Sequence, residues 1–330
     1  MKKVFVIIIS VMINATIYAG EPFAIHSFPS ASITGLEIET IGGNITLTSN
    51  GSEESTVEVF LGKTDKTNAE TDEEIKKIFD EYYTVNVRVA LGKLSAVVTR
   101  KKKRPRNELL NVSFNINIPK NVSGKMKALG GDISINGISG ELEIKSVGGS
   151  FMLDGVSGKI SGNTVGGNIN LINSTANTSL TTVGGNINLT NTTADIFLKT
   201  VGGKIQASNS AGEIHLNNIG GSVRVNDLKG DIHLSTIGES ITVNNIIGTL
   251  HASIVQGTVE MKNISDTINL TLKDEKNRGY NLNITAENVK TTGMKDFSGK
   301  MNTETLIGTI GDGRSKIEIS QSKQVNLSFK

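Results

Sequence analysis

A period of nine residues governs the placement of hydrophobic and polar side chains over residues 129–272. Sixteen nonapeptides follow one another there without insertion or deletion, and VGGNINLIN (165–173) and VGGNINLTN (183–191) show the unit. Positions 5 and 7 are each apolar in 15 of the 16 units, whereas positions 4, 6 and 8 are mostly polar. This alternation is typical of a strand with one buried face. A helix is excluded, because its apolar period would be 3.6 rather than 2.

Glycine separates the predicted strands. Position 3 is Gly in 12 of the 16 units, and Gly-Gly pairs recur in every second nonapeptide, as at 148–149 and 166–167. We therefore predict that each nonapeptide is one strand and one turn, in which Gly allows a positive φ or a close approach of two backbones. Two nonapeptides then close one coil.

Coils of equal length stack with their strands paired about 4.8 Å apart. The predicted fold class is therefore all-β: a single-stranded β-helix, or β-solenoid, with 18-residue coils built from two nonapeptides. Small polar residues at position 9 are expected to form ladders between coils, Asn at one corner and Ser or Thr at the other. These residues are Asn173, Asn191, Asn209, Asn245 and Asn263, and Ser146, Thr164, Thr182, Thr200 and Thr236.

The flanking regions keep β character but leave the nine-residue register. In the N-terminal one, SITGLEIETIGGNITLTS (32–49) repeats the Gly-Gly theme out of phase, and strands are predicted at Thr84–Ala90 and Asn111–Ile118. We assign residues 20–120 to a β-rich N-terminal capping region, 121–272 to the solenoid array, and 273–330 to C-terminal strands that cap the other end.

One short helix is predicted near residues 70–83, within TNAETDEEIKKIFDEYY (67–83). Its apolar residues recur at helical spacing, so one face of the helix is expected to contact the cap. These residues are Ile75, Ile78, Phe79 and Tyr82.

The N-terminal segment 1–19, MKKVFVIIISVMINATIYA, has the pattern of a secretory signal peptide. Lys2 and Lys3 precede a short apolar run, and small residues end at Ala19. The run is shorter than the roughly 20 residues of a membrane-spanning helix. We therefore predict export to the periplasm, the outer-membrane surface or the medium, with no transmembrane segment after cleavage.

The amino-acid composition excludes several kinds of functional site. The chain has no Cys, which excludes disulfides, thiolate metal sites and Cys nucleophiles. Signal cleavage removes two lysines and no acid from 34 basic and 32 acidic residues, so the mature chain is neutral and carries no signature of nucleic-acid binding. No cofactor is predicted.

Catalytic motifs are also missing from the sequence. No zinc-protease, nucleophile-elbow or phosphate-loop motif is present, and the uninterrupted array leaves no inserted loops to build a cleft. The Gly-Gly unit lacks the Asp and third Gly of calcium-binding nonapeptides. We predict a non-enzymatic protein without catalytic residues, although a site confined to the flanks stays open.

Three of the four histidines, His215, His233 and His251, occupy outward position 6 in every second nonapeptide. They are expected to stack about 5 Å apart beside Phe197 as a possible binding surface. Such a ladder could bind Zn²⁺ or Cu²⁺, or respond to pH. Its side chains point in parallel, however, and no fourth ligand is identified, so the favoured interpretation is a surface ladder without metal. The acids at position 4, Asp195, Glu213 and Asp231, are interpreted as solvated.

The densest charge run is RKKKRPR (100–106). Lys101, Lys102, Lys103 and Arg104 could bind anionic surface polymers such as lipopolysaccharide or teichoic acid. The favoured interpretation is a solvated loop whose charge is offset by the acids of the predicted helix.

Residues 111–153, NVSFNINIPKNVSGKMKALGGDISINGISGELEIKSVGGSFML, resemble the putative-adhesin family of bacterial domains of unknown function, which are auto-transporter-adhesin-like. In that family a strand ending in Pro precedes a β-solenoid of G-[DN]-[IL]-x-[VIL] repeats. The resemblance implies an exported β-helical protein of the cell envelope, and it brings no catalytic residues.

The leading hypothesis is an adhesin-like cell-envelope or surface protein whose partners are envelope or host glycans or surface proteins. The alternative is a periplasmic scaffold or regulatory protein that binds a partner. A carbohydrate-active enzyme is the third reading. Ligand identity, coil handedness and oligomeric state are left open by the sequence.

Overall fold

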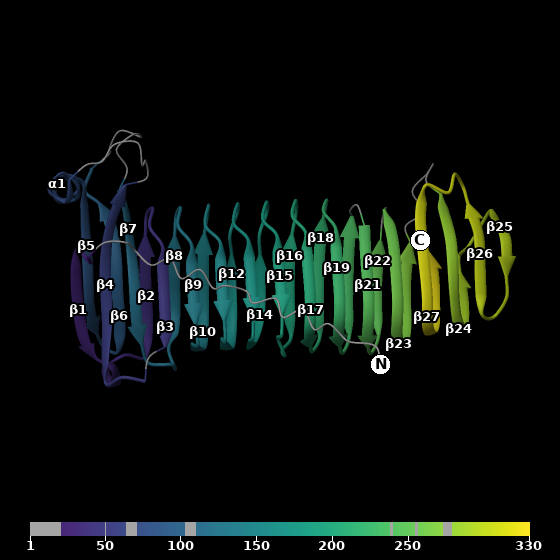
Figure 1. Cartoon of the computed structure of the whole chain (residues 1–330), viewed down its shortest axis with the longest axis horizontal. Coiled ribbons are helices and arrows are strands. Elements are labelled where there is room, and N and C mark those ends of the chain that lie inside the picture. Colours follow the sequence, from purple (N-terminus) through teal and green to yellow (C-terminus); the bar gives the residue numbers. More distant parts are fainter. Residues whose placement is uncertain are drawn as a thin grey trace, which may run out of the picture.

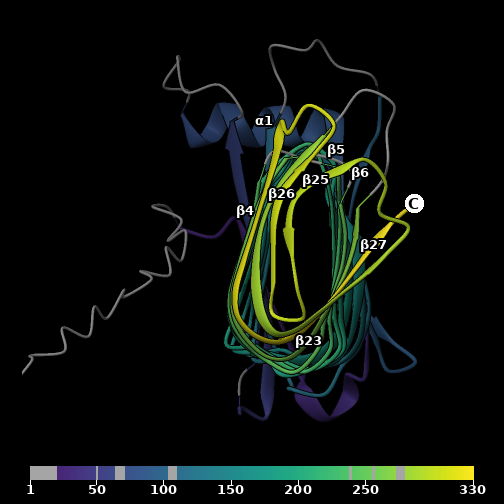
Figure 2. The same ribbon diagram turned by 90° about the vertical axis from the view of Figure 1, so that its right-hand side faces the viewer.

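The chain folds into a long column of stacked coils with a flattened cross-section (Figures 1 and 2). This computed structural model describes residues 21–49, 51–63, 71–102, 110–237, 240–254, 257–272 and 279–330. The predicted all-β solenoid is confirmed. The predicted signal peptide, 1–19, lies outside the described residues. Among the helices in the described part of the chain, none is long and apolar enough to cross a membrane.

Strands of the array alternate between two faces of the column. The even face consists of β8 (Ser123–Ala128), β10 (Ser139–Ser146), β12 (Ser157–Asn163), β14 (Thr175–Thr181), β16 (Ile196–Thr200), β18 (Ile214–Ile219), β20 (Ile232–Ile237) and β22 (Leu250–Ile254). The odd face consists of β9 (Ile133–Asn136), β11 (Phe151–Asp154), β13 (Ile169–Ile172), β15 (Ile187–Thr190), β17 (Ile205–Ala211), β19 (Val223–Lys229) and β21 (Ser240–Ile247). A long strand, β23 (Thr258–Leu272), pairs with both β21 and β22.

Neighbouring strands on each face pair in parallel with a constant offset of two nonapeptides. On the odd face Ile169 pairs with Ile187, and on the even face Ile196 pairs with Ile214. Because the offset equals one repeat pair, every position of the nonapeptide lies directly beside its counterpart in the next coil.

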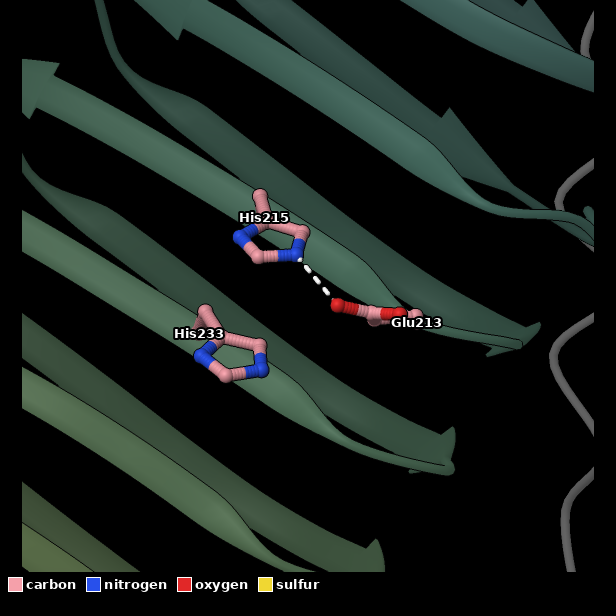
Figure 3. Close-up of side chains that lie close together, drawn as sticks. All are labelled: Glu213, His215 and His233. Atoms are coloured by element: carbon pink, nitrogen blue, oxygen red, sulfur yellow. Dashed lines mark hydrogen bonds and ion pairs between the residues drawn. The ribbon is translucent and has the colours of Figure 1, made fainter.

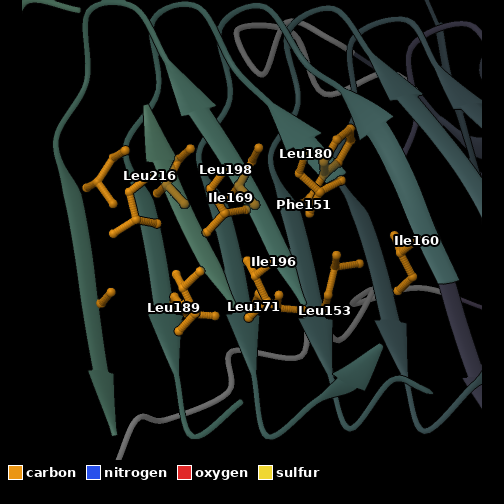
Figure 4. Close-up of a cluster of buried hydrophobic side chains, with 14 of the residues drawn as sticks. Phe151, Leu153, Ile160, Ile169, Leu171, Leu180, Leu189, Ile196, Leu198 and Leu216 are labelled. Carbon is orange, nitrogen blue, oxygen red and sulfur yellow. The ribbon is translucent and has the colours of Figure 1, made fainter. Parts of the chain in front are cut away.

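Side chains from positions 5 and 7 of both faces meet inside the column (Figure 4). Ile169 and Leu171 of β13 and Leu180 of β14 are fully buried. Burying such a side chain stabilises the fold by about 1.5–3 kcal/mol. One coil contributes only a few of these side chains, so stability is a property of the stack.

The two corners of each coil differ in backbone conformation. At the Asn corner, position 9 adopts the left-handed conformation, with φ of 50° at Asn173 and 52° at Asn191, and the Asn191 side-chain amide donates to Asn173 Oδ1 (3.2 Å). This ladder agrees with the prediction. Asp227 (φ 56°) also belongs to it and accepts from Asn245 Nδ2 (2.8 Å).

At the opposite corner, the Thr corner, hydroxyls bond between coils as predicted, and their partners are backbone groups. The side chains are buried, and those of Ser146, Thr164, Thr182 and Thr200 make these bonds. Thr182 Oγ1 donates to the Gly167 carbonyl of the preceding coil (2.8 Å) and accepts from the Gly185 N–H (3.2 Å). The inward side chain thus satisfies two backbone groups of the Gly-Gly turn, which water does not reach.

The second Gly of each pair is required by close approach rather than by a positive φ. A Cβ at Gly167 would lie only 2.0 Å from the Gly149 carbonyl oxygen, whereas the atoms nearest to a Cβ at Gly166 would lie 3.8 Å away. Backbones of neighbouring coils therefore touch at position 3.

The parallel stack extends beyond the array at its N-terminal end. Strands β2 (Gly35–Thr40) and β3 (Ile45–Ser49) pair with β8 and β9, and Ile45 lies beside Ile133. The Asn44 side chain accepts from the Asp132 N–H (2.9 Å). The segment expected only in the cap therefore forms a coil of the stack, because its Gly-Gly-Asn turn repeats the geometry of the array.

An antiparallel cap covers this end of the column. Strands β6 (Lys93–Arg100) and β7 (Leu110–Ile118) continue the parallel stack, and β5 (Tyr83–Ala90) and β4 (Glu54–Lys63) pair antiparallel with them. The outermost strand, β1 (Ala24–Pro29), leads into a short 3-10 turn at Ser30–Ser32 and pairs with β4.

The predicted helix is α1 (Asp72–Tyr82), and it lies against this cap (Figure 1). It begins with a reciprocal capping box between Thr71 and Glu74. Phe79 is buried, and the other three apolar residues of the predicted face pack against the core. The strands predicted at 84–90 and 111–118 are present, whereas β6 was not predicted.

The C-terminal strand inserts into the stack out of sequence order. Strand β27 (Ser315–Phe329) pairs in parallel with both β23 and β24 (Tyr280–Thr292). Two antiparallel strands, β26 (Thr305–Ile310) and β25 (Phe297–Met301), follow β24. Antiparallel pairs thus lie at both ends of the parallel column, where edges would otherwise be open.

Candidate functional site

A column of four rings runs along the even face at position 6. It consists of Phe197 on β16, His215 on β18, His233 on β20 and His251 on β22. Each ring lies directly beside the next because the strands pair in register. The distance between ring centroids is 6.4 Å from Phe197 to His215, 4.3 Å from His215 to His233, and 4.7 Å from His233 to His251. The His ladder predicted from the spacing of two nonapeptides is therefore present.

The orientation of the imidazoles determines which ligands they could contact. The planes of His215 and His233 lie 4° apart, and those of His233 and His251 lie 6° apart. Because the rings cover one another's faces, their nitrogen-bearing edges are what the column offers to solvent. Edges of this kind suit hydrogen bonds or metal coordination better than the stacking of a sugar on an aromatic face.

Glu213 lies beside the ladder, just before β18 begins and two residues before His215 (Figure 3). Its Oε1 lies 2.9 Å from His215 Nε2. The hydrogen bond from His215, and then its charge, lower the pKa of the Glu213 carboxyl. Glu213 is exposed, as the sequence interpretation of a solvated acid requires, and it also bonds to His215.

His233, at the centre of the ladder, favours the neutral state. Partial burial lowers its pKa first, and the neighbouring imidazoles His215 and His251 lower it further. A neutral imidazole is the form that binds metal ions.

A shallow depression of about 350 Å³ follows the ladder, with a polar row at position 8 as its other border. That row includes Asn217, Ser235 and Ser253. Beyond His251, the column continues with amides: Asn269 Nδ2 lies 3.4 Å from His251 Nδ1, and Asn326 Nδ2 donates to Asn269 Oδ1 (2.8 Å).

The described start of the basic run, Lys101 and Lys102, lies elsewhere, beside α1. Lys102 forms an ion pair with Glu81 (2.8 Å) and lies 4.8 Å from the centre of the Tyr82 ring. Lys101 Nζ donates to the Asp80 carbonyl (2.6 Å). Lys103 and Arg104 lie outside the described residues. The two described lysines thus contact the acidic helix, and they do not join the His ladder.

Sequence reasoning missed an exposed row of apolar side chains at the Thr corner. Position 1 points inward where it follows a left-handed residue, which is Asn, Asp or Gly, and outward in the other described units. Val165, after Thr164, is 47% exposed, whereas Val156, after Gly155 (φ 61°), is 1% exposed. The apolar row consists of Leu129, Val147, Val165, Val183, Val201 and Ile219. The residue type at position 9, just before each position 1, could have revealed this exposed row from the sequence.

No protein-family model and no curated protein matches this chain. Two solved structures are similar to it along almost their whole length. One is described as a putative cell adhesion protein from Clostridium sporogenes ATCC 15579, with 13% identity and a TM-score of 0.21 over 93% of this chain and 98% of that one. The other is described as a putative adhesin from Bacteroides fragilis NCTC 9343, with 12% identity and a TM-score of 0.33 over 92% and 96%. At these identities and TM-scores neither structure assigns a role or a ligand to this chain.

Proposed function

We propose that this chain is an exported, non-enzymatic, adhesin-like protein of the cell surface or envelope, and that it binds its ligand through the polar odd face. The observation that carries the proposal is the row of equivalent amides on that face. Asn188 Nδ2 donates to Asn170 Oδ1 (2.7 Å) at position 6, and Asn168 Oδ1 accepts from the Asn186 N–H (2.8 Å) at position 4.

These amides keep hydrogen-bonding capacity for a ligand. A carboxamide has two N–H donors and two acceptor lone pairs. The bond between Asn188 and Asn170 uses one donor of the first and one lone pair of the second, and both residues are only partly buried. The four Asn residues of these two coils therefore present uncharged donors and acceptors at a spacing of about 4.8 Å, which suits a ligand that is itself repetitive, such as a glycan.

Rigidity favours binding by many weak contacts. The strands beneath these side chains are fixed by parallel pairing on both sides and by a fully buried core. Little conformational freedom is lost when such a surface binds, so small gains from successive coils add up.

The test combines location with binding. On intact cells the adhesin reading predicts that added protease cleaves the protein, and protection from protease would contradict it. The mature chain should bind members of a panel of bacterial and host polysaccharides. A variant carrying Asn170→Val and Asn188→Val should lose that binding, while Ser179→Ala, at position 6 of the even face, should keep it. Cleavage of a polysaccharide by the mature chain would establish an enzyme instead.

The apolar row favours a second candidate function, a periplasmic scaffold that binds another protein. Contiguous exposed apolar side chains are typical of protein interfaces, and Val183 is 49% exposed in the middle of this row. This reading predicts protection from protease on intact cells and cleavage after the outer membrane is opened. The variant Val165→Thr with Val183→Thr should then reduce recovery of a partner after crosslinking.

A further inference from the structure

We propose that Glu213, His215 and His233 form a surface site for a divalent transition-metal ion, for which Zn²⁺ is the probe. One ligand atom from each residue takes part, and these three atoms all lie within 4.8 Å of one another. His215 and His233 come from two adjacent strands, β18 and β20, whose pairing fixes the relative position of the two backbones, and Glu213 lies just before β18 (Figure 3).

The distances are close to those that coordination requires. Three atoms no more than 4.8 Å apart share a point about 2.8 Å from each, and Zn–N and Zn–O bonds are about 2.0–2.2 Å long. Each ligand atom therefore has to move by about 0.7 Å, and the two imidazole rings have to turn out of their parallel stack so that their lone pairs meet at the ion. No strand has to shift.

The donor set selects the class of ion. Imidazole nitrogen suits Zn²⁺, Cu²⁺ and Ni²⁺, whereas Mg²⁺ and Ca²⁺ prefer sites made entirely of oxygen. Two imidazoles and one carboxylate leave at least one coordination position for water or for a group from a partner. The site has room for such a group, because the side chains of His215 and Glu213 are 39% and 57% exposed.

Charge around the site also favours a cation. The Ile214 N–H donates to the Asp231 carbonyl (3.0 Å), which places Asp231 in the coil next to Glu213. Two acidic residues of neighbouring coils thus lie beside two histidines.

The parallel arrangement of the rings does not prevent coordination. Stacked imidazoles cannot surround an ion by themselves, which is why the sequence alone argues against a metal. Glu213 supplies a third ligand from the residue just before β18, at the ring edge of His215. Rotation of the two imidazole rings out of their parallel stack brings their in-plane lone pairs onto the same ion.

Isothermal titration of the mature chain with Zn²⁺ tests the proposal. One saturable site per chain is expected at micromolar Zn²⁺. His233→Asn and Glu213→Gln should each weaken binding by more than about tenfold, since removal of even an outer-shell partner costs a metal site 10–100-fold. The matched control is His26→Asn, which removes the histidine of β1 and should leave binding unchanged.

A second measurement keeps the test independent of the variants. Zn²⁺ added to the unaltered chain should shift the imidazole NMR signals of His215 and His233 and leave that of His26 unchanged. Two results would overturn the proposal: no saturable binding below millimolar Zn²⁺, or saturable binding that survives both His233→Asn and Glu213→Gln. Because these readouts need no ligand of the odd face, they are independent of the adhesin proposal.

Discussion

Thr182 and Thr236 occupy the same position of the Thr corner and are equally well buried, at 2% and 3% exposure. They differ in their hydrogen bonds. Thr182 bonds to the Gly167 carbonyl and the Gly185 N–H, whereas Thr236 Oγ1 has no partner within the described residues. The same substitution, Thr to Val, should therefore have opposite effects at the two positions.

At Thr182, Val keeps the shape of the side chain and removes the hydroxyl. The Gly185 N–H then loses its acceptor inside the column, and the Gly167 carbonyl loses a donor. A buried group left unpaired costs about 1–3 kcal/mol. Because two groups lose a partner, we expect Thr182→Val to lower the free energy of unfolding by about 1–3 kcal/mol or more.

At Thr236 the hydroxyl is already buried without compensation. Burial of an unpaired hydroxyl costs about 1–3 kcal/mol in protein mutational data. Thr236→Val removes this cost and leaves no backbone group newly unpaired. The variant should be as stable as the original chain or more stable.

Equilibrium unfolding in guanidinium, followed by far-ultraviolet circular dichroism, gives both changes as shifts of the midpoint at constant slope. Hydrogen exchange adds a local readout: the Gly185 amide should exchange faster in Thr182→Val. Equal destabilisation by the two substitutions would refute the reasoning, because it would show that these residues act through packing rather than through hydrogen bonds.

Three further predictions follow from the coil geometry. Gly167→Ala should destabilise the chain by about 1–3 kcal/mol through overpacking against the preceding coil, whereas Gly166→Ala, with open space, should stay within about 0.5 kcal/mol in the same assay. Ile187→Ala should cost about 2–5 kcal/mol, and Val183→Ala, on the exposed row, should change the unfolding midpoint little. Lys145 and Lys125 lower the pKa of Glu143 to about 2. The stability that ionised Glu143 contributes is therefore complete above the ordinary pKa of 4.5 and is lost as pH falls toward 2. Glu143→Gln should flatten this part of an acid-unfolding curve, and an NMR titration of the Glu143 carboxyl near 4.5 would contradict the prediction.

The array could be predicted from the sequence because every contact in it repeats a local rule. Ile169 is buried for the same reason as Ile187, and one register, an offset of two nonapeptides, places both. The outward direction of Val165 was missed because it depends on the conformation of the preceding residue. A left-handed Asn turns the chain so that the next side chain points inward, and an extended Thr does not.

Pairing between distant segments explains the other differences. Ile45 lies beside Ile133, although the whole N-terminal cap separates the two along the chain, and β27 separates β23 from β24. No local pattern specifies which segment is inserted between two others. The Gly-Gly turn at 42–43 repeats the turn of the array. Because it is out of phase with the nonapeptides of the array, the sequence did not show that it belongs to a coil.

The regularity of the column makes departures from it informative about function. Position 6 of the even face needs only to point outward, and Glu143, Ser161 and Ser179 occupy it without disturbing the parallel pairing. The fold therefore does not require His at this position in three consecutive coils. Packing does not favour it either, since partial burial and the neighbouring imidazoles lower the pKa of His233 and make its protonated form costly. The strand and the core leave the His ladder unexplained, whereas the proposed metal site, for which Glu213 provides the third ligand atom, would account for two of its three histidines.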